Sequence, residues 1–490
     1  MSGSDFLKGK ASNEKLSLIG LTAVVLSAMV GGGIFDLPKD MAINAGAAGQ
    51  ILAWLFTGIG MCFITIMFMY LSQLQPHLTT GLYKYGEQGF GKFTGFLISW
   101  GYWICECFTN VTYAILVMST LNYFWPGYFT GGNNWLSIIL ASIIFWCIFL
   151  IITRGVKSAN HTGLIGTIGM LIAVAIFLIV MANHFSWHTF FINFQASHNI
   201  TALHDKNLGS ISHQVLKTLS VTLWVFGGIE GAVVLSNHAR SQKQVRHATI
   251  LGFIACVILY SLASLLPLGS TSYGEIARMS SPSTAQLLTN AMHSSIGHII
   301  ISVGLIVSVL ASWLTWTMML AEMPFAAAKD KAFPRYFAKE NCKHVPIFSL
   351  LMATCVMQVI LIFAHFAQNA FTTMYTIVAT LTVPPYLISA LYLVKLAFQK
   401  KLIPLKNDYF LRWRALLIGI LATIYIVIMG LAAGINNLSI AFIIYALGIP
   451  FFIEAQHEYA PHKKVFGRLE RWFALGIIVI AIVGCYLLIK

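Results

Sequence analysis

The sequence predicts an all-α protein that crosses a membrane many times. Of its 490 residues, 58 % are hydrophobic and 9 % are charged, so too few charged side chains are present to cover a chain of this length in water. A spanning helix needs about 20 apolar residues, and runs of that kind recur along the whole chain. Two of the runs are interrupted by glycines. Together these features predict an inverted five-helix repeat transporter core with broken helices 1 and 6, followed by C-terminal spans to give 12–13 in total.

The apolar runs divide the chain into four parts. A short N-terminal segment, residues 1–16, precedes a first five-helix repeat over residues 17–183. A second, inverted repeat is expected over residues 214–397, and additional C-terminal helices over residues 415–489. The apolar runs themselves lie near residues 17–35, 50–73, 92–124, 135–153, 160–183, 214–236, 249–270, 297–325, 347–366, 371–397, 415–434, 438–454 and 472–489.

The basic residues predict the orientation of these spans. Cytoplasmic loops carry an excess of Lys and Arg, and with the amino terminus inside, nearly all of the 30 basic residues fall in cytoplasmic segments. The net charge of +14 is thereby explained by topology, and no nucleic-acid partner is implied. The exceptions, on the other side or at its edge, are Lys39, Lys206, Lys217, Arg278 and Lys490.

The glycine clusters mark the candidate substrate site. Gly31–Gly33 interrupt the first run, and Gly227 belongs to a second cluster in the sixth run. A helix broken at mid-membrane depth is tolerated only where its freed backbone lines a cavity. Amides freed at Gly32 and Gly33 can bind a carboxylate, and carbonyls freed near Met29 can accept from an α-ammonium. The alternative is that these glycines only allow close helix packing.

Three carboxylates lie deep in the predicted spans, and an ionisable residue there is a functional candidate by default. Glu230 follows the second glycine cluster and is a candidate for proton coupling, or else a protonated cap for a neighbouring helix. Glu106 stands four residues before Asn110, and this pair either binds a guanidinium or ammonium of the substrate or has a structural role. Glu322 lies nearer the cytoplasmic end of its span and is interpreted as a tether between helices rather than a transport residue.

Four stretches carry a family resemblance. They are GGGIFDLPKDMA (31–42), GFLISWGYWICECFTNVTYA (95–114), TLWVFGGIEGA (222–232) and WTMMLAEMPFAAAKDKAFP (316–334). Through them the chain resembles the basic amino acid/polyamine antiporter family of the amino acid, polyamine and organocation superfamily, most of all bacterial arginine/ornithine antiporters, with arginine/agmatine antiporters as more distant relatives. The resemblance implies a bacterial inner-membrane exchanger of a cationic amino acid (arginine, ornithine or lysine class) for a related amino acid or amine by alternating access. A proton-coupled symporter of the same fold is the alternative, and relatives suggest a homodimer.

The resemblance also assigns gating roles to aromatic residues. It matches Trp224 to an outer gate and Trp316 to the layer between substrate and cytoplasm. Tyr102, Glu230 and Tyr386 match an inner gate. Aromatic side chains without such a match are interpreted as packing or interface anchors.

Three further positions bear on the candidate site. The family usually has a serine where this chain has Gly32, so one hydroxyl contact to the substrate carboxylate is missing. Thr380 and Thr382, just before the Pro384–Pro385 kink, either face the substrate cavity or bond the backbone of their own helix. The full set of predicted substrate-binding residues is Met29, Gly31, Gly32, Gly33, Glu106, Asn110, Trp224, Gly227, Trp316 and Thr380.

The motifs do not favour an enzyme or a primary pump. The sequence has no G-x-x-x-x-G-K-[ST] nucleotide loop, no H-E-x-x-H and no G-x-S-x-G, so neither catalysis nor a cofactor is expected. The histidines of the loop at 184–213 lack metal-ligand spacing and are interpreted as part of a solvated loop rather than an acid sensor. A channel is not distinguished from a carrier by these motifs.

Overall fold

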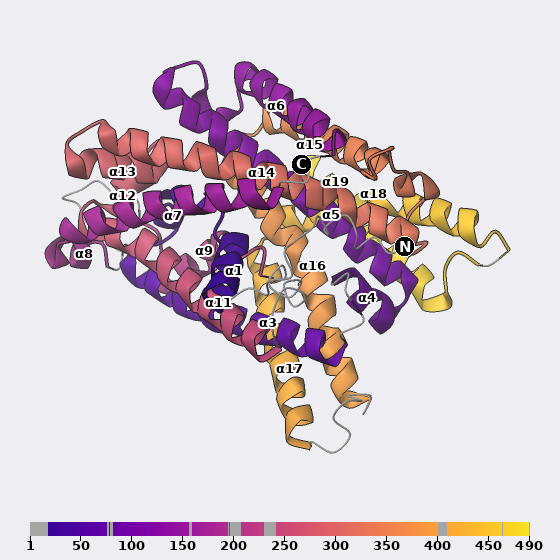
Figure 1. Cartoon of the computed structure of the whole chain (residues 1–490). Coiled ribbons are helices and arrows are strands. Elements are labelled where there is room, and N and C mark those ends of the chain that lie inside the picture. Colours follow the sequence, from indigo (N-terminus) through magenta and orange to yellow (C-terminus); the bar gives the residue numbers. More distant parts are fainter. Residues whose placement is uncertain are drawn as a thin grey trace.

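A computed structural model of the chain describes residues 18–75, 78, 82–155, 159–194, 196, 207–229, 242–399, 409–462 and 464–489, and these are largely helical, with no strand among them. Eleven of the described helices are long and apolar enough to cross a membrane. They are α3 (Ala47–Leu74), α5 (Lys92–Phe124), α6 (Trp135–Thr153), α7 (Ala159–Asn183), α11 (Gln242–Leu265), α14 (Ile296–Lys329), α15 (Ile347–Ala364), α16 (Ala370–Phe398), α17 (Tyr409–Ala432), α18 (Ile435–Tyr459) and α19 (Arg468–Ile489) (Figure 1).

The two remaining predicted spans contain the broken helices. α1 (Leu18–Met29) stops at the glycine cluster and is followed by the 3₁₀ turn η2 (Gly32–Phe35) and by α2 (Leu37–Ala42). α9 (Ile211–Val225) stops at Val225 and continues as turns to Ile229. The predicted breaks in helices 1 and 6 are therefore confirmed. The other short helices are η3 (Thr130–Gly132), α4 (Leu82–Phe90), α8 (Trp187–Ile192), η5 (Leu266–Gly269), α12 (Tyr273–Arg278), α13 (Ser283–Met292) and η6 (Arg335–Ala338).

Local sequence explains where each break falls. Gly31 is extended, with φ −109° and ψ −168°, and caps the 3₁₀ turn. Pro38 stands in the first turn of α2, where its missing N–H costs no helical hydrogen bond. In the second break Gly228 has φ +93°, a left-handed conformation that favours glycine because it lacks a Cβ. The two glycine clusters thus produce different backbone paths.

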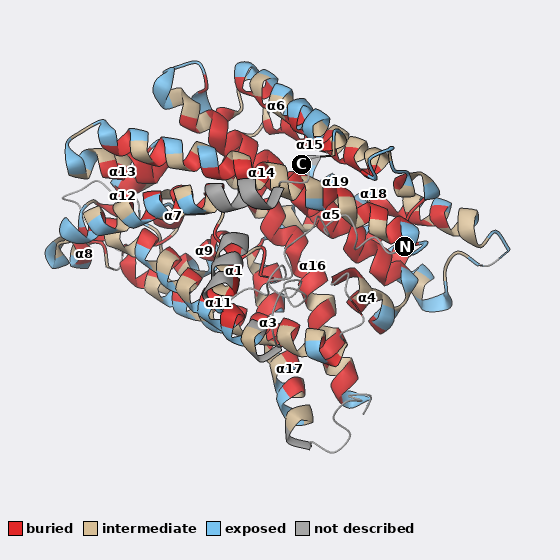
Figure 2. Cartoon of the chain, in the orientation of Figure 1, coloured by how far each residue is buried: buried red, intermediate tan, exposed pale blue. Residues whose placement is uncertain are grey.

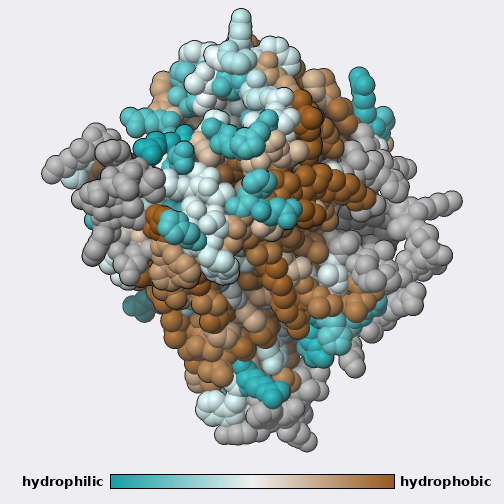
Figure 3. All heavy atoms as spheres, turned by 90° about the vertical axis from the view of Figure 1, so that its left-hand side faces the viewer, coloured by the Kyte–Doolittle hydropathy of each residue, from teal (hydrophilic) through white to brown (hydrophobic). Residues whose placement is uncertain are grey.

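Helix α5 forms the centre of the molecule. Of its apolar stretch, 89 % is buried inside the protein, compared with 22 % for α19 at the periphery, and Figure 2 shows α5 mostly in the colour of buried residues. α5 packs against α4, α14, α15, α16 and α18. The exposed residues of the outer helices are mostly apolar, as expected of surfaces that face lipid. Figure 3, seen from the side where α8, α12 and α13 lie, shows broad hydrophobic areas with hydrophilic patches.

Polar contacts fix the part of the first broken helix that follows the glycine cluster. The Asp36 carboxylate accepts a hydrogen bond from the Ser283 amide at 2.8 Å and another from the Ser281 hydroxyl. The Thr284 hydroxyl donates to the Phe35 carbonyl at 2.7 Å. The segment around α13 therefore holds η2 and α2 in place.

An ion pair ties α4 to the far end of α14. Lys84 lies 2.8 Å from Asp330 and 2.8 Å from Glu87. Partial burial alone would lower the pKa of Lys84, but hydrogen bonds to these two carboxylates raise it above its ordinary value. Lys84 is therefore charged throughout the physiological pH range, and the ion pair persists with it.

Candidate functional site

A cavity of about 50 Å³ lies between the two broken helices and α5. Both breaks supply backbone to its wall, and α5, α11, α14 and α16 supply side chains. The residues around it are Met29, Gly31, Gly32, Gly33, Tyr102, Glu106, Thr109, Tyr113, Leu223, Trp224, Val225, Gly227, Gly228, Tyr260, Ser312, Trp316, Val378 and Thr382. Eight of the predicted substrate-binding residues are among them, and Asn110 and Thr380 are not.

The first break brings its glycines against neighbouring side chains. A Cβ on Gly33 would lie 2.4 Å from the Trp224 ring, which is far inside van der Waals contact. A Cβ on Gly32 would lie 2.8 Å from Val309 and 3.0 Å from Leu116. The serine that is usual in the resembling family therefore has no room at Gly32 with these neighbours. The amides of Gly32 and Gly33 lie at the start of η2, where helical N–H groups favour an anion.

One face of α5 supplies polar side chains to the cavity. Tyr102, Glu106, Thr109 and Tyr113 follow one another at helical spacing and all line it. Glu106 is 6 % exposed and carries the one ionisable acid among the described residues of the wall. A carboxylate so placed can attract a cationic group that enters the cavity.

Asn110 points elsewhere and is not brought together with Glu106 at the cavity. Its amide nitrogen donates to the backbone carbonyl of Glu106 at 2.9 Å. Its side-chain oxygen accepts from the Thr317 hydroxyl of α14 at 3.4 Å. The predicted pair of side chains thus divides into a cavity residue and a residue that joins α5 to α14.

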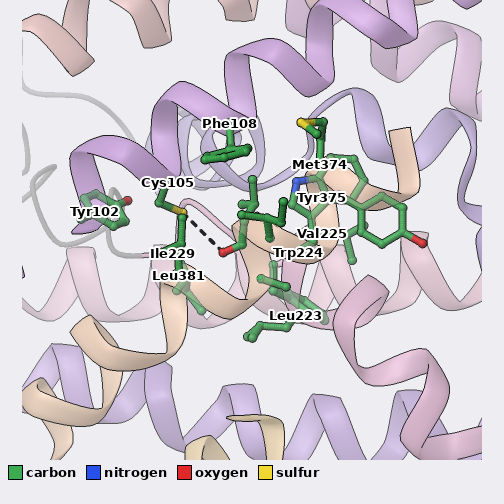
Figure 4. Close-up of a cluster of buried hydrophobic side chains, with 14 of the residues drawn as sticks. Tyr102, Cys105, Phe108, Leu223, Trp224, Val225, Ile229, Met374, Tyr375 and Leu381 are labelled. Carbon is green, nitrogen blue, oxygen red and sulfur yellow. Dashed lines mark hydrogen bonds between the residues drawn. The ribbon is translucent and has the colours of Figure 1, made fainter. Parts of the chain in front are cut away.

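Aromatic rings close the cavity on the side of α2 and the first turns of α16. Trp224 stacks on Tyr375, with ring centroids 5.1 Å apart and planes at 21°, and meets Phe371 edge-on at 5.6 Å. Figure 4 shows the Trp224 and Tyr375 side chains next to each other. The Tyr375 hydroxyl lies 3.5 Å from the Asp40 carboxylate on α2. Trp224 is therefore held by α16, which in turn contacts α2.

The residues assigned to the inner layer are only partly assembled around the cavity. Trp316 and Tyr102 line it. Tyr386 is buried but is not among the wall residues. Its ring meets that of Phe68 of α3 edge-on, with centroids 5.4 Å apart. Glu230 lies outside the described residues.

The remaining polar candidates occupy different places. The Thr380 hydroxyl donates a hydrogen bond to the Thr376 carbonyl of its own helix at 2.8 Å, whereas Thr382 lines the cavity. Glu322 is half-buried on α14 and is not part of the cavity wall. No group of three or more His, Cys, Asp or Glu that could hold a metal occurs in the described part of the chain; His198 and His204 of the 184–213 loop lie outside it.

Several wall residues were missed by sequence reasoning. Thr109 and Tyr113 share the helical spacing of Tyr102 and Glu106, so the period of α5 could have identified them. Tyr260 and Ser312 come from α11 and α14 and have no local pattern that marks them. Their positions depend on how helices far apart in sequence pack together.

Comparisons with known proteins identify the family of the chain. A family model described as amino acid permease matches residues 16–463. A Clostridium perfringens (strain 13 / Type A) protein named "Putative amino-acid transporter" is 50 % identical over 479 residues, or 98 % of this chain and 99 % of that one. The arginine/agmatine antiporter of Chlamydia felis (strain Fe/C-56) is 44 % identical, covering 94 % of each chain.

Two further comparisons cover most of the chain. The arginine/agmatine antiporter of Chlamydia trachomatis serovar L2 is 40 % identical over 95 % of this chain and 94 % of that one. The crystal structure of MhsT in complex with L-phenylalanine superimposes with a TM-score of 0.57 at 15 % identity, and covers 86 % of this chain and 100 % of MhsT. At that identity the likeness concerns the fold alone, and it supports the inverted-repeat transporter architecture.

Proposed function

Since the chain belongs to the amino acid permease family, we propose that it exchanges a cationic amino acid for a related amino acid or amine across the membrane. The observation that carries this proposal is the Glu106 carboxylate in the wall of a cavity bounded by two broken helices. Relatives named arginine/agmatine antiporters support both the exchange and the cationic substrate class. The proposed exchanger uses no cofactor.

The breaks provide recognition of an α-amino acid. The amides of Gly32 and Gly33 at the start of η2 suit the α-carboxylate, and the Met29 carbonyl at the end of α1 suits the α-ammonium. Because these are backbone groups, they accept any amino acid. Discrimination must therefore come from side chains in the cavity wall.

Glu106 supplies that discrimination. A carboxylate with little exposure loses part of its hydration, and a guanidinium or ammonium that reaches it restores charge balance and adds charge-assisted hydrogen bonds. A neutral side chain offers neither. We therefore assign Glu106 to the distal cationic group of the substrate.

The cavity must enlarge for transport. At about 50 Å³ it is well below the roughly 300–1,000 Å³ of typical ligand sites. The Trp224 side chain fills space directly above Gly33, so its displacement would open the cavity toward α2. We propose that this compact arrangement is a closed form in an alternating-access cycle, with Trp224 as the outer gate and Trp316 toward the cytoplasm.

The proposed topology follows the charge distribution. The chain is a multi-pass membrane protein, and we place its amino terminus in the cytoplasm of a bacterial cell, in the inner membrane, because nearly all Lys and Arg then face inward. In this orientation α4 and its ion pair with α14 lie on the cytoplasmic side.

Counterflow in proteoliposomes tests the function. Vesicles loaded with unlabelled arginine, ornithine, lysine, agmatine or putrescine should accelerate uptake of labelled arginine, whereas vesicles loaded with buffer should not. A channel would show no acceleration. A proton symporter would instead respond to an imposed pH gradient with empty vesicles. Uptake that is independent of internal substrate would contradict the exchange proposal.

A further inference from the structure

Tyr260 of α11 touches both broken helices at once. Its hydroxyl lies 2.8 Å from the carbonyl oxygen of Met29 and 2.8 Å from the carbonyl oxygen of Val225. These are the last residues of α1 and α9. The side chain is 1 % exposed, yet it forms part of the cavity wall.

The single hydroxyl proton of Tyr260 lies between two carbonyl oxygens, one at the end of each broken helix. The carboxyl end of a helix carries a partial negative charge, and its last carbonyls have no partner within the helix. Buried carbonyls are costly when they are not hydrogen-bonded, but a tyrosine hydroxyl has a single proton to donate. The point where α1 and α9 meet is therefore short of donors and favours positive charge.

The position of the hydroxyl is fixed by the ring that carries it. Tyr260 stacks on Trp54, with planes at 13° and centroids 6.1 Å apart, and meets Phe226 edge-on at 5.5 Å. The Trp54 indole is held in turn by a 2.8 Å hydrogen bond to Ser264. Tyr260 therefore cannot swing away without disrupting an aromatic cluster that includes Phe226, the first residue of the second break.

We propose that the Tyr260 hydroxyl acts as a partial internal substitute for the substrate α-ammonium, sharing its single proton between the two helix ends when the transporter is empty. This inference rests on the proposed function, in which the α-ammonium binds at the same carbonyls. An ammonium brings three N–H donors and a full positive charge. It can therefore donate to both carbonyls at once, which the single hydroxyl proton cannot do. Tyr260 is thus a positioning residue that lowers the free energy of the empty, closed form.

The proposal predicts a tightening of substrate binding when the hydroxyl is removed. In Tyr260→Phe the ring remains, but in the empty protein the two carbonyls lose the hydroxyl that donates to them, whereas the loaded protein still has the ammonium. The free-energy difference between the empty and the substrate-loaded protein therefore grows, in favour of the loaded protein. By titration calorimetry on purified protein, we expect the Kd for arginine to fall by roughly three- to tenfold, since one hydrogen bond to a buried group is at stake.

Matched controls separate this role from a general packing role. Tyr445 of α18 is also buried, and its hydroxyl makes no hydrogen bond within the described part of the chain; Tyr445→Phe should leave the Kd unchanged. An arginine analogue with hydrogen in place of the α-amino group should gain nothing in Tyr260→Phe. Replacement of Tyr260 by 4-aminophenylalanine, which offers two N–H protons to the two carbonyls, should weaken arginine binding instead.

Each outcome decides a different question. The proposal is overturned if a folded Tyr260→Phe variant binds arginine as well as or more weakly than the wild type. It is also overturned if the 4-aminophenylalanine variant binds arginine more tightly. Either result leaves the proposed function intact. If the phenylalanine variant does not fold, the 4-aminophenylalanine variant alone decides, because its effect has the opposite sign. A wild-type protein that binds no α-amino acid would overturn the proposed function, and the inference with it.

Discussion

At the scale of single residues, we propose that Glu106 determines which substrates the cavity favours. Replacement by glutamine keeps the shape of the side chain and removes its charge. We predict that Glu106→Gln weakens binding of arginine, ornithine or lysine by roughly tenfold or more, about 1.4 kcal/mol, and changes binding of any neutral amino acid little. Titration calorimetry measures both. Glu322→Gln, which alters a membrane glutamate outside the cavity wall, is the matched control, and an equal loss for cationic and neutral ligands would assign Glu106 to the fold.

Gly32 is a residue whose neighbours leave little space for a side chain. A Cβ there would meet Val309 at 2.8 Å, and overpacking of this kind typically costs about 1–3 kcal/mol. We predict that Gly32→Ser lowers the thermal unfolding temperature in detergent and does not strengthen amino acid binding. Val309→Ala in the same chain should restore most of the loss, because it makes space for the new side chain. A serine variant as stable as wild type would show that the backbone can shift at this point.

At the scale of helices, Trp316 is the aromatic side chain that α14 contributes to the cavity wall. If it separates substrate from the cytoplasm by its bulk, Trp316→Ala should impair exchange in proteoliposomes while the protein remains folded in detergent. Trp146→Ala, at an exposed position of α6, controls for the loss of a tryptophan as such. Exchange at the wild-type rate in Trp316→Ala would rule out the assigned role.

The helices also show why the sequence predicts some of this site and not the rest. The two breaks are predictable because glycine clusters act locally, and the cavity face of α5 follows from its own period. The bonds of Tyr260 to Met29 and Val225 are different: they join residues 231 and 35 positions apart. Similarly, Asn110 is drawn toward Thr317 by the packing of α14 against α5. Such contacts depend on the relative positions of helices, which no local pattern encodes.

At the scale of the whole molecule, opening and closing require the two breaks and their surroundings to move together. Trp224 of α9 lies against Gly33 of the first break and against Tyr375 of α16. On the other side, Lys84 of α4 is paired with Asp330 at the end of α14. The partners at each end come from distant parts of the chain, so displacement of Trp224 must disturb contacts of η2, α9 and α16 together. That coupling is what alternating access requires.

The sequence places Glu230 directly after the second break, and we propose it as the group that couples protons to this cycle. If its carboxyl group exchanges a proton or closes the inner gate, the pH dependence of transport must contain its titration. Glu230→Gln keeps the shape of the protonated acid and cannot titrate. We therefore predict that the exchange rate of this variant in proteoliposomes depends little on pH. Across the pH series it should stay close to the rate that the wild type reaches at acid pH. A profile identical to wild type would instead indicate that Glu230 caps a neighbouring helix and that any proton coupling resides in another group.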